Sequence, residues 1–322
     1  MYSKPLLFGF FLLATSQLVR AQDSSLLSKL NDSMSANPQT TYITGTFKAT
    51  HIVNLQTVES PANGAMIFLI QHRFGAVNSG SYNFFGLDGG ATFRLALDYG
   101  LTDRLNVGIG RTSAQKTYDG YLKYKLLRQT DGNEKIPVSI SVLGTLNIIT
   151  DTNYKKFVAP NFQDRPAYVL QLLIARKISS RLSLELAPTY INNNLRYGPT
   201  DKTDIFALGI GGRLKITRRM SINAEYNYLL SNQIDSFKSA ALTVQKRHNA
   251  FSLGWDMETG GHVFQLVFSN SQNMLETQYL TQTTGRWGNG DIYFGFNISR
   301  NFNLKKKRHN YSDTPNEKTD HP

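Results

Sequence analysis

Residues 204–230 read DIFALGIGGRLKITRRMSINAEYNYLL, and apolar and polar side chains alternate through most of this stretch. Phe206 and Ile210 fall on one face of a period-two pattern, while Arg213 falls on the other. A helix would need spacings of three and four, so the pattern predicts two strands joined by a short turn near residues 217–219. Each arm has about ten residues, the length with which a tilted strand crosses a bilayer.

The same pattern recurs along the chain, and short connections alternate with longer, polar ones. We predict twelve strands, near residues 65–74, 90–99, 104–113, 119–128, 137–149, 166–178, 181–191, 204–216, 220–230, 248–258, 262–271 and 291–303. Outer-membrane barrels combine tight turns on one side, longer loops on the other and an even number of strands. The sequence therefore predicts a single transmembrane, antiparallel up-and-down β-barrel of about twelve strands. The alternative fold is a soluble periplasmic β-sandwich or double barrel.

Composition narrows the class of protein further. The 322 residues include no Cys, which excludes disulfides, thiolate metal sites and a Cys nucleophile. Aromatic residues make up 11% of the chain and charged residues 18%, and the mean hydropathy is slightly negative. These values suit an alternating barrel better than a helical membrane protein. The net charge of +12 is spread along the chain rather than clustered, so we expect no nucleic-acid partner.

The two ends of the chain differ from the middle. A Lys precedes a short apolar run and small residues near position 21, which is typical of a secretory signal peptide. We predict the following organisation: signal peptide 1–21, flexible leader 22–45, barrel domain 46–304 with spanning strands from about 65, and basic polar tail 305–322. Residues 46–55 alternate poorly, and we interpret them as an accessory strand or strap, because a thirteenth spanning strand would break the even count.

Aromatic residues mark both ends of the expected strands. Tyr168 and Tyr226 fall at the outer ends of lipid-facing rows and Tyr99 at an inner end, as interfacial girdles would. The last strand, residues 291–303, approaches the aromatic-ended C-terminal strand by which assembly machinery recognises such barrels. We therefore expect a protein of the cell outer membrane, with outer-membrane lipid and the assembly machinery as partners. The sequence does not define the oligomeric state, and a monomer is the default.

Several motifs in the N-terminal half resemble a known family. They are QHRFG (71–75), FGLDGG (85–90), LDYGLTDR (97–104), VGIGR (107–111) and YLKYKLL (121–127). The sequence from about residue 47 to 302 is similar to a domain-of-unknown-function family of Bacteroidetes, described as a membrane-bound β-barrel domain. This resemblance implies a fold and a location, and it implies no activity or site.

The polar face of the expected strands carries charges of both signs. Under the predicted register, five cations and four anions project inward: Arg94, Lys123, Lys125, Arg213, Lys215, Asp98, Glu185, Glu225 and Asp256. Inward charges of both signs either form a satisfied network that fills a barrel or line a pore. Twelve strands give an intermediate width, so this balance alone does not decide between the two.

Sites for catalysis or cofactors are not indicated. The chain has no phosphate-binding GxxxxGK[ST] signature, and its His residues lack zinc-site spacing. Gly209 and Gly211 lie within an expected strand, where small residues leave space in the lumen or allow a bend. His72 and Arg73 end an expected strand, and we interpret them as pairing with Asp88 to order the first long loop. We predict no cofactor and no metal.

Three functions stay open. The first is passage of a small solute through the barrel, with a mild preference for anions. The second is a barrel sealed inside that binds a partner through the loops 75–89, 150–165, 231–247 and 272–290. The third, a lipid-modifying enzyme, requires a Ser within hydrogen-bond reach of His72. We expect no enzymatic activity.

Overall fold

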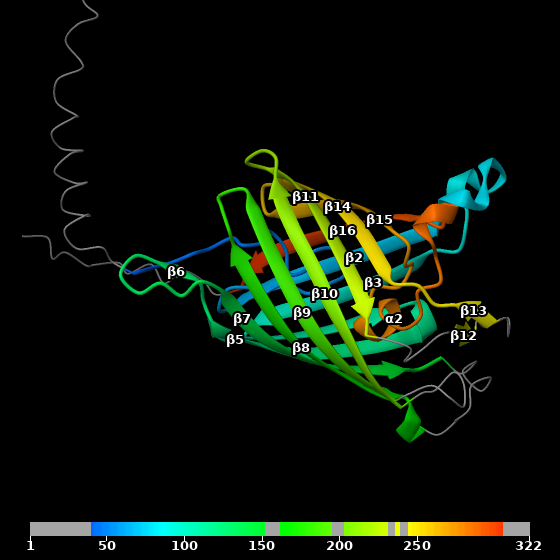
Figure 1. Cartoon of the computed structure of the whole chain (residues 1–322), viewed down its shortest axis with the longest axis horizontal. Coiled ribbons are helices and arrows are strands. Elements are labelled where there is room, and N and C mark those ends of the chain that lie inside the picture. The colour runs from blue at the N-terminus through cyan, green and yellow to red at the C-terminus, as the bar shows by residue number, and fades with distance from the viewer. Residues whose placement is uncertain (1–39, 152–161, 195–202, 231–235, 239–243, 305–322) are drawn as a thin grey trace, which may run out of the picture.

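Twelve strands close into one antiparallel barrel in the computed structural model, and each pairs with the next barrel strand along the chain (Figure 1). The structure describes residues 40–151, 162–194, 203–230, 236–238 and 244–304. The barrel strands are β2 (Ala65–Ala76), β3 (Thr92–Gly100), β4 (Leu105–Thr112), β5 (Thr117–Leu127), β7 (Ser139–Ile149), β8 (Pro166–Lys177), β9 (Leu182–Asn193), β10 (Asp204–Lys215), β11 (Met220–Leu229), β14 (Ala250–Thr259), β15 (His262–Ser269) and β16 (Tyr293–Asn303). The predicted fold class is confirmed, and closure between β16 and β2 leaves the barrel without an unpaired edge.

Smaller elements are not part of the barrel wall. β1 (Thr41–Tyr42) pairs with β6 (Thr130–Asp131), and β12 (Ser236–Lys238) pairs with β13 (Val244–Lys246). The short helices are η1 (Val77–Ser79), η2 (Ser81–Gly86), η3 (Ala114–Lys116), η5 (Phe162–Asp164), α2 (Glu276–Tyr279) and η6 (Trp287–Asn289). Among the helices of the described residues, none has the length and apolar character needed to cross a membrane.

The stretch 204–230 forms the β10–β11 hairpin, in which Gly211 lies opposite Glu225. Phe206 and Ile210 are exposed on the outer face, while Ala207 is buried on the inner face. The alternation in the sequence thus separates the lipid-facing side of the hairpin from its lumen side.

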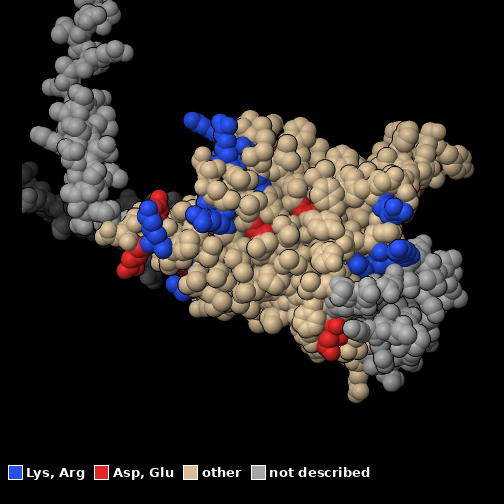
Figure 2. Space-filling model, viewed as in Figure 1, with Lys and Arg blue, Asp and Glu red and all other residues tan. Residues whose placement is uncertain are grey.

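Connections of different length gather at opposite ends of the barrel. The turns β3–β4, β8–β9, β10–β11 and β14–β15 lie at one end, which we call the short-turn end (left in Figure 1). Connections such as β2–β3, β11–β14 and β15–β16 lie at the other, the long-loop end. In Figure 2, Lys and Arg side chains gather toward both ends, and the wall between them is mostly uncharged. Large apolar side chains are exposed along that wall, as a lipid-facing surface requires.

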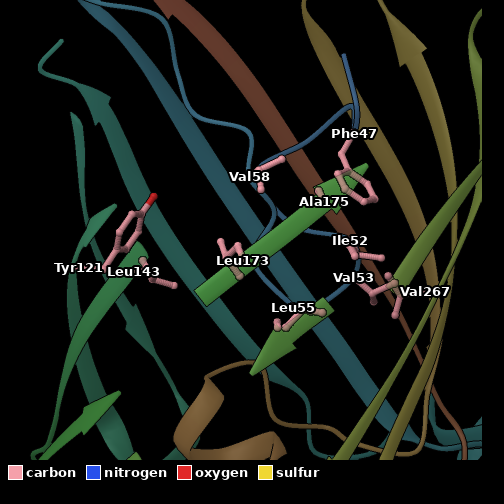
Figure 3. Packing of buried hydrophobic residues seen from close by; sticks show 11 residues of the cluster. Phe47, Ile52, Val53, Leu55, Val58, Tyr121, Leu143, Leu173, Ala175 and Val267 are labelled. Carbon is pink, nitrogen blue, oxygen red and sulfur yellow. The ribbon is translucent and has the colours of Figure 1, made fainter. Parts of the chain in front are cut away.

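The inside of the barrel is occupied by two parts of the same chain. Residues 46–60, the inner segment, enter from the short-turn end, turn back near Ile52–Leu55 and rejoin the wall before β2. Figure 3 shows their apolar side chains surrounded by the strands. Residues 270–285, the lumen loop, include α2 and fold inward from the long-loop end. The predicted signal peptide and basic tail lie outside the described residues.

Candidate functional site

The tip of the inner segment is held by one carboxylate of the barrel wall. Glu225 on β11 accepts hydrogen bonds from the backbone N–H groups of Val53, Asn54 and Leu55, at 2.9–3.0 Å. The turn brings these three successive N–H groups together, because Ile52 N–H bonds back to Leu55 O at 2.8 Å. Adjacent N–H groups that point the same way form a concave anion site. Glu225, which is 1% exposed, occupies this site as a built-in anion.

The other polar groups of the tip are also bound by the wall. Arg73 Nη2 donates to Asn54 Oδ1 at 2.8 Å, and Asn297 Nδ2 donates to Val53 O at 2.9 Å. Gln265 Nε2 donates to Ile52 O at 2.7 Å. Donors from β2, β15 and β16 therefore complement the acceptor from β11, and the tip is bound from several sides of the barrel. Satisfied buried polar groups of this kind fix one arrangement of a segment.

The two limbs of the inner segment have their own wall partners. Glu185 accepts a hydrogen bond from Val58 N–H at 3.0 Å, and Asp98 accepts one from the Thr50 hydroxyl at 3.2 Å. Lys123 Nζ donates to the carbonyl oxygens of Thr57 and Glu59, at 2.9 and 3.0 Å. Three of the inward charges predicted from the sequence thus bind backbone or hydroxyl groups of one segment.

Apolar contacts with the wall also hold the inner segment in place. Ile52, Val53 and Leu55 are buried in a cluster with Phe47, Val58 and wall residues such as Leu143 and Leu173 (Figure 3). Fully burying one side chain of this size stabilises a fold by roughly 1.5–3 kcal/mol. The inner segment is therefore held by apolar burial as well as by polar contacts.

Glycines of the wall make room for this cluster. A Cβ built on Gly211 would lie 2.3 Å from Ile52 Cδ1, and one built on Gly209 would lie 3.0 Å from Leu55 Cδ1. On β14, a Cβ on Gly254 would lie 3.0 Å from Val53 Cγ2. The inner segment thus fills the space that these glycines leave on the inner faces of β10 and β14.

The lumen loop closes the other end of the barrel. Tyr279 and Leu280 pack in a buried cluster with wall residues of β8, β9, β10, β11 and β14. On the opposite side, Asn147 Nδ2 donates to Thr277 Oγ1 and Gln278 Nε2 donates to Thr117 Oγ1, both at 3.1 Å. The loop therefore contacts strands around most of the barrel. It fills the lumen between the inner segment and the long-loop end.

The family model described as "Membrane bound beta barrel domain (DUF5777)" matches residues 47–302, which is most of the chain. The chain belongs to this family. Its matched region begins at the inner segment, so the inner segment is part of the family domain together with the wall.

Solved structures similar to this DUF5777 barrel include three outer-membrane proteins. A KdgM porin is 9% identical, covering 74% of this chain and 99% of its own, with a TM-score of 0.44. An outer membrane channel from Pseudomonas putida F1 is 15% identical, covering 76% and 97%, with a TM-score of 0.41. The Acinetobacter baumannii outer membrane protein Omp33 is 7% identical, covering 76% and 100%, with a TM-score of 0.39. A comparison with curated proteins finds no match.

The remaining inward charges of the DUF5777 barrel have wall partners or lie near its mouth. Arg94 forms a buried ion pair with Asp119 at 2.5 Å, and its Nη1 donates to Gln71 Oε1 at 2.9 Å. Asp256 accepts hydrogen bonds from Ser221 and Gln265, and Arg213 Nε donates to Ser221 Oγ at 3.0 Å. Lys125 and Lys215 are half-buried toward the short-turn end.

The expected loop-ordering motif is arranged differently. Neighbouring strand residues point to opposite faces, so Arg73 faces the lumen while His72 faces outward. The His72 ring stacks on Phe296 with centroids 5.2 Å apart, and Asp88 is exposed in the turn after η2. Within the described residues, neither side chain bonds to Asp88, and no Ser hydroxyl bonds to His72. The first long loop is instead attached through Asn78, whose Nδ2 donates to Asp291 Oδ1 at 2.5 Å.

Sequence reasoning missed several residues that carry this arrangement. Asp119, Gln265 and Asn297 lie on inner faces, and period two applied to their strands would have found them. The sequence predicts an accessory strand or strap for residues 46–55 and a polar loop for residues 272–290, and neither prediction places these residues in the lumen. The signal for the lumen loop is its apolar content at Met274–Leu275 and Tyr279–Leu280, which an exposed loop does not need.

Two titratable groups of the filling segments are affected by burial. Burial lowers the pKa of His51 well below its usual range, and the nearby cations Arg94, Lys123 and Arg73 act in the same direction. The His51 imidazole is therefore neutral, and its Nδ1 lies 3.2 Å from the Thr50 hydroxyl. Burial raises the pKa of the Glu276 carboxyl to about 7, against the attraction of Arg94.

The glycine–isoleucine contact gives a first testable prediction. Gly211→Ala places a methyl group against Ile52 and is expected to destabilise the folded barrel by about 1–3 kcal/mol, as overpacking does. Adding Ile52→Ala to the same chain should remove most of that penalty, giving a coupling between the two sites. The free energy of unfolding of the refolded protein in urea measures both effects.

Gly144→Ala provides the matched control, because nothing lies within 4 Å of a Cβ built on this strand glycine. Additive costs for Gly211→Ala and Ile52→Ala would contradict the contact.

Proposed function

We propose that this chain is an outer-membrane barrel that is closed at rest and acts as a binding or scaffold protein through its long-loop end. The observation that carries the proposal is the double filling of the lumen, by the inner segment from one end and the lumen loop from the other. Both fillings combine apolar burial with hydrogen bonds from many strands. Opening either would expose apolar surface and break buried polar contacts, each at a cost.

Location in the outer membrane is part of this proposal. The family is one of membrane-bound barrels, and the outer face of the strands carries a band of exposed apolar side chains. Residues 1–21 have the features of a secretory signal peptide. A protein of this kind would cross the inner membrane and insert with its tight turns in the periplasm, which places the long-loop end outside the cell.

The long-loop end offers a surface suited to a partner. Tyr82 is 95% exposed on η2, and Phe84 and Phe85 beside it are more than half exposed. Phe84 and Phe85 have φ values of 45° and 54°, a conformation that bulky residues rarely adopt. Strained, exposed aromatic residues on an anchored loop support a role in recognition, since aromatic side chains are enriched at interfaces. We propose a non-enzymatic role on this basis.

Passage of a small solute is a second candidate, favoured by the way the inner segment is held. Glu225, Glu185 and Lys123 bind it through polar side-chain ends, and the same groups could be hydrated if the segment moved. The five inward cations and four anions predicted from the sequence would then favour anions mildly. Arg73, Asp119 and Glu258 also face inward, which brings the count to six charges of each sign. In the closed state, Arg94 and Lys123 are bound to Asp119 and to the inner segment, so they do not face a passing solute.

Conductance in planar bilayers tests the choice between the two. The refolded intact chain is expected to insert without steady single-channel current, because both halves of the lumen are filled. An open porin inserted under the same conditions serves as the positive control. Steady current in most insertion events would reject the closed barrel and favour passage.

A further inference from the structure

A pocket of about 240 Å³ opens at the short-turn end, between the inner segment and the wall. One side is formed by residues that lead into and out of the inner segment, including Thr44, Thr46 and Glu59. The other side is formed by β5 and β7, with Lys125 and Ser141 among the lining residues. The pocket is separate from the aromatic surface at the long-loop end and belongs to neither candidate function described above.

Four charged side chains of both signs line this pocket. They are Glu59, Asp103, Lys125 and Arg128. Glu59, Asp103 and Arg128 are also the charged neighbours that act on Lys125. In the described part of the chain, none of the four forms an ion pair with another. The pocket thus presents two cations and two anions that are close enough to interact but do not neutralise one another by direct contact.

A buried hydroxyl group points to a ligand independently of the charges. Ser141 lines the pocket and is only 1% exposed, and its Oγ has no hydrogen-bond partner among the described residues. Ser139, on the same face of β7, accepts a hydrogen bond from Gln129 N–H at 3.0 Å. A buried hydroxyl without a hydrogen-bond partner is unfavourable, because it has lost its bonds to water. A polar ligand in the pocket would satisfy Ser141.

We propose that this pocket binds a small zwitterion, of the class of amino acids and dipeptides. Its carboxylate meets Lys125 and Arg128, its ammonium group meets Glu59 and Asp103, and the Ser141 hydroxyl bonds to one of its polar atoms. The cavity volume of about 240 Å³ leaves room for a small molecule of this class. The balance of lining charges favours a ligand that carries both signs over a simple anion or cation.

Binding at this pocket would also tighten the inner segment. Glu59 follows Val58, whose N–H donates to Glu185. The carbonyl oxygen of Glu59 accepts a hydrogen bond from Lys123. A ligand that contacts Glu59 on one side and Lys125 on the other joins the segment to the wall. A ligand that binds only the folded protein adds stability that grows with its concentration.

Isothermal titration of the refolded full chain tests the site, with glycylglycine as the zwitterionic probe. Acetate and ethylammonium carry one charge each and serve as comparison probes. We expect glycylglycine to bind, with each single-charge probe at least about tenfold weaker, a difference of about 1.4 kcal/mol. If acetate binds as tightly as glycylglycine, the pocket is an anion site and the proposal of a zwitterion site is rejected. No heat from glycylglycine at tens of millimolar would overturn the site itself.

Variants connect the binding to these side chains. Lys125→Met is expected to weaken glycylglycine binding at least about tenfold, since it removes one charge partner of the carboxylate. Ser141→Ala, a small change that a strand tolerates, should weaken binding as well. Lys215→Met removes a half-buried cation near the same end but outside the pocket, and it should leave the affinity unchanged. Equal effects of Lys125→Met and Lys215→Met, or no effect of Ser141→Ala, would reject the assignment.

Discussion

Glu225→Ala is expected to release the tip of the inner segment and to lower the free energy of unfolding by at least about 3 kcal/mol. The substitution leaves the N–H groups of Val53, Asn54 and Leu55 buried without an acceptor. Each such group costs about 1–3 kcal/mol when it is buried and unsatisfied. Hydrogen exchange at these three amides should become faster, and unfolding in urea gives the loss of stability.

The isosteric change Glu225→Gln separates the loss of charge from the loss of an acceptor. The amide keeps one carbonyl oxygen, but its NH₂ group faces N–H donors, so we expect an intermediate effect. Glu258→Ala is the matched control, because Glu258 is also an inward carboxylate, on β14, and its partner Lys48 is about one-third exposed. Such an exposed pair contributes about 0–1 kcal/mol. Similar losses for Glu225→Ala and Glu258→Ala would contradict the proposed role of Glu225.

The barrel could be predicted because its wall follows a local rule. Period two places Phe206 outward and Glu225 inward whatever the neighbouring strands are, and the alternation of short and long links gives the direction of each strand. The strands in the structure agree with the predicted ones to within a few residues at their ends. The resemblance to the family also came from motifs within residues 71–127, most of which lie on strands of the wall.

The filled lumen could not be predicted in the same way. The inner segment has no repeating conformation of its own, and its shape is imposed by groups on distant strands such as Glu225 and Glu185. Those carboxylates bind backbone N–H groups, which every residue except proline carries, so no side-chain pattern in residues 46–60 identifies them as partners. Gly211 and Gly209 predict either space in the lumen or a bend, and only the structure shows that Ile52 and Leu55 fill the space beside them.

The inner segment and the lumen loop block successive parts of the lumen, so we expect that both must be removed to open the barrel. We expect a chain with residues 46–60 replaced by a Gly/Ser linker of equal length to remain nearly closed, because the lumen loop still contacts wall strands on opposite sides. A linker in place of residues 271–284 alone should also leave it nearly closed, since the inner segment fills the remaining length. Flexible linkers of this composition do not refill a lumen with fixed structure.

Both replacements together are expected to give steady single-channel steps larger than the sum of the two single variants, measured in planar bilayers. Replacing residues 78–85, in η1 and η2 at the long-loop end, by a linker of equal length is the control. These residues lie outside the lumen (Figure 1), so their replacement should leave the barrel closed. Faster gel migration of the unheated protein shows that each variant has folded. Full opening by one replacement would assign the whole barrier to that segment. A folded double variant that stays closed would mean that the wall side chains alone block the lumen, and the inner segment and lumen loop would then not be what closes this barrel.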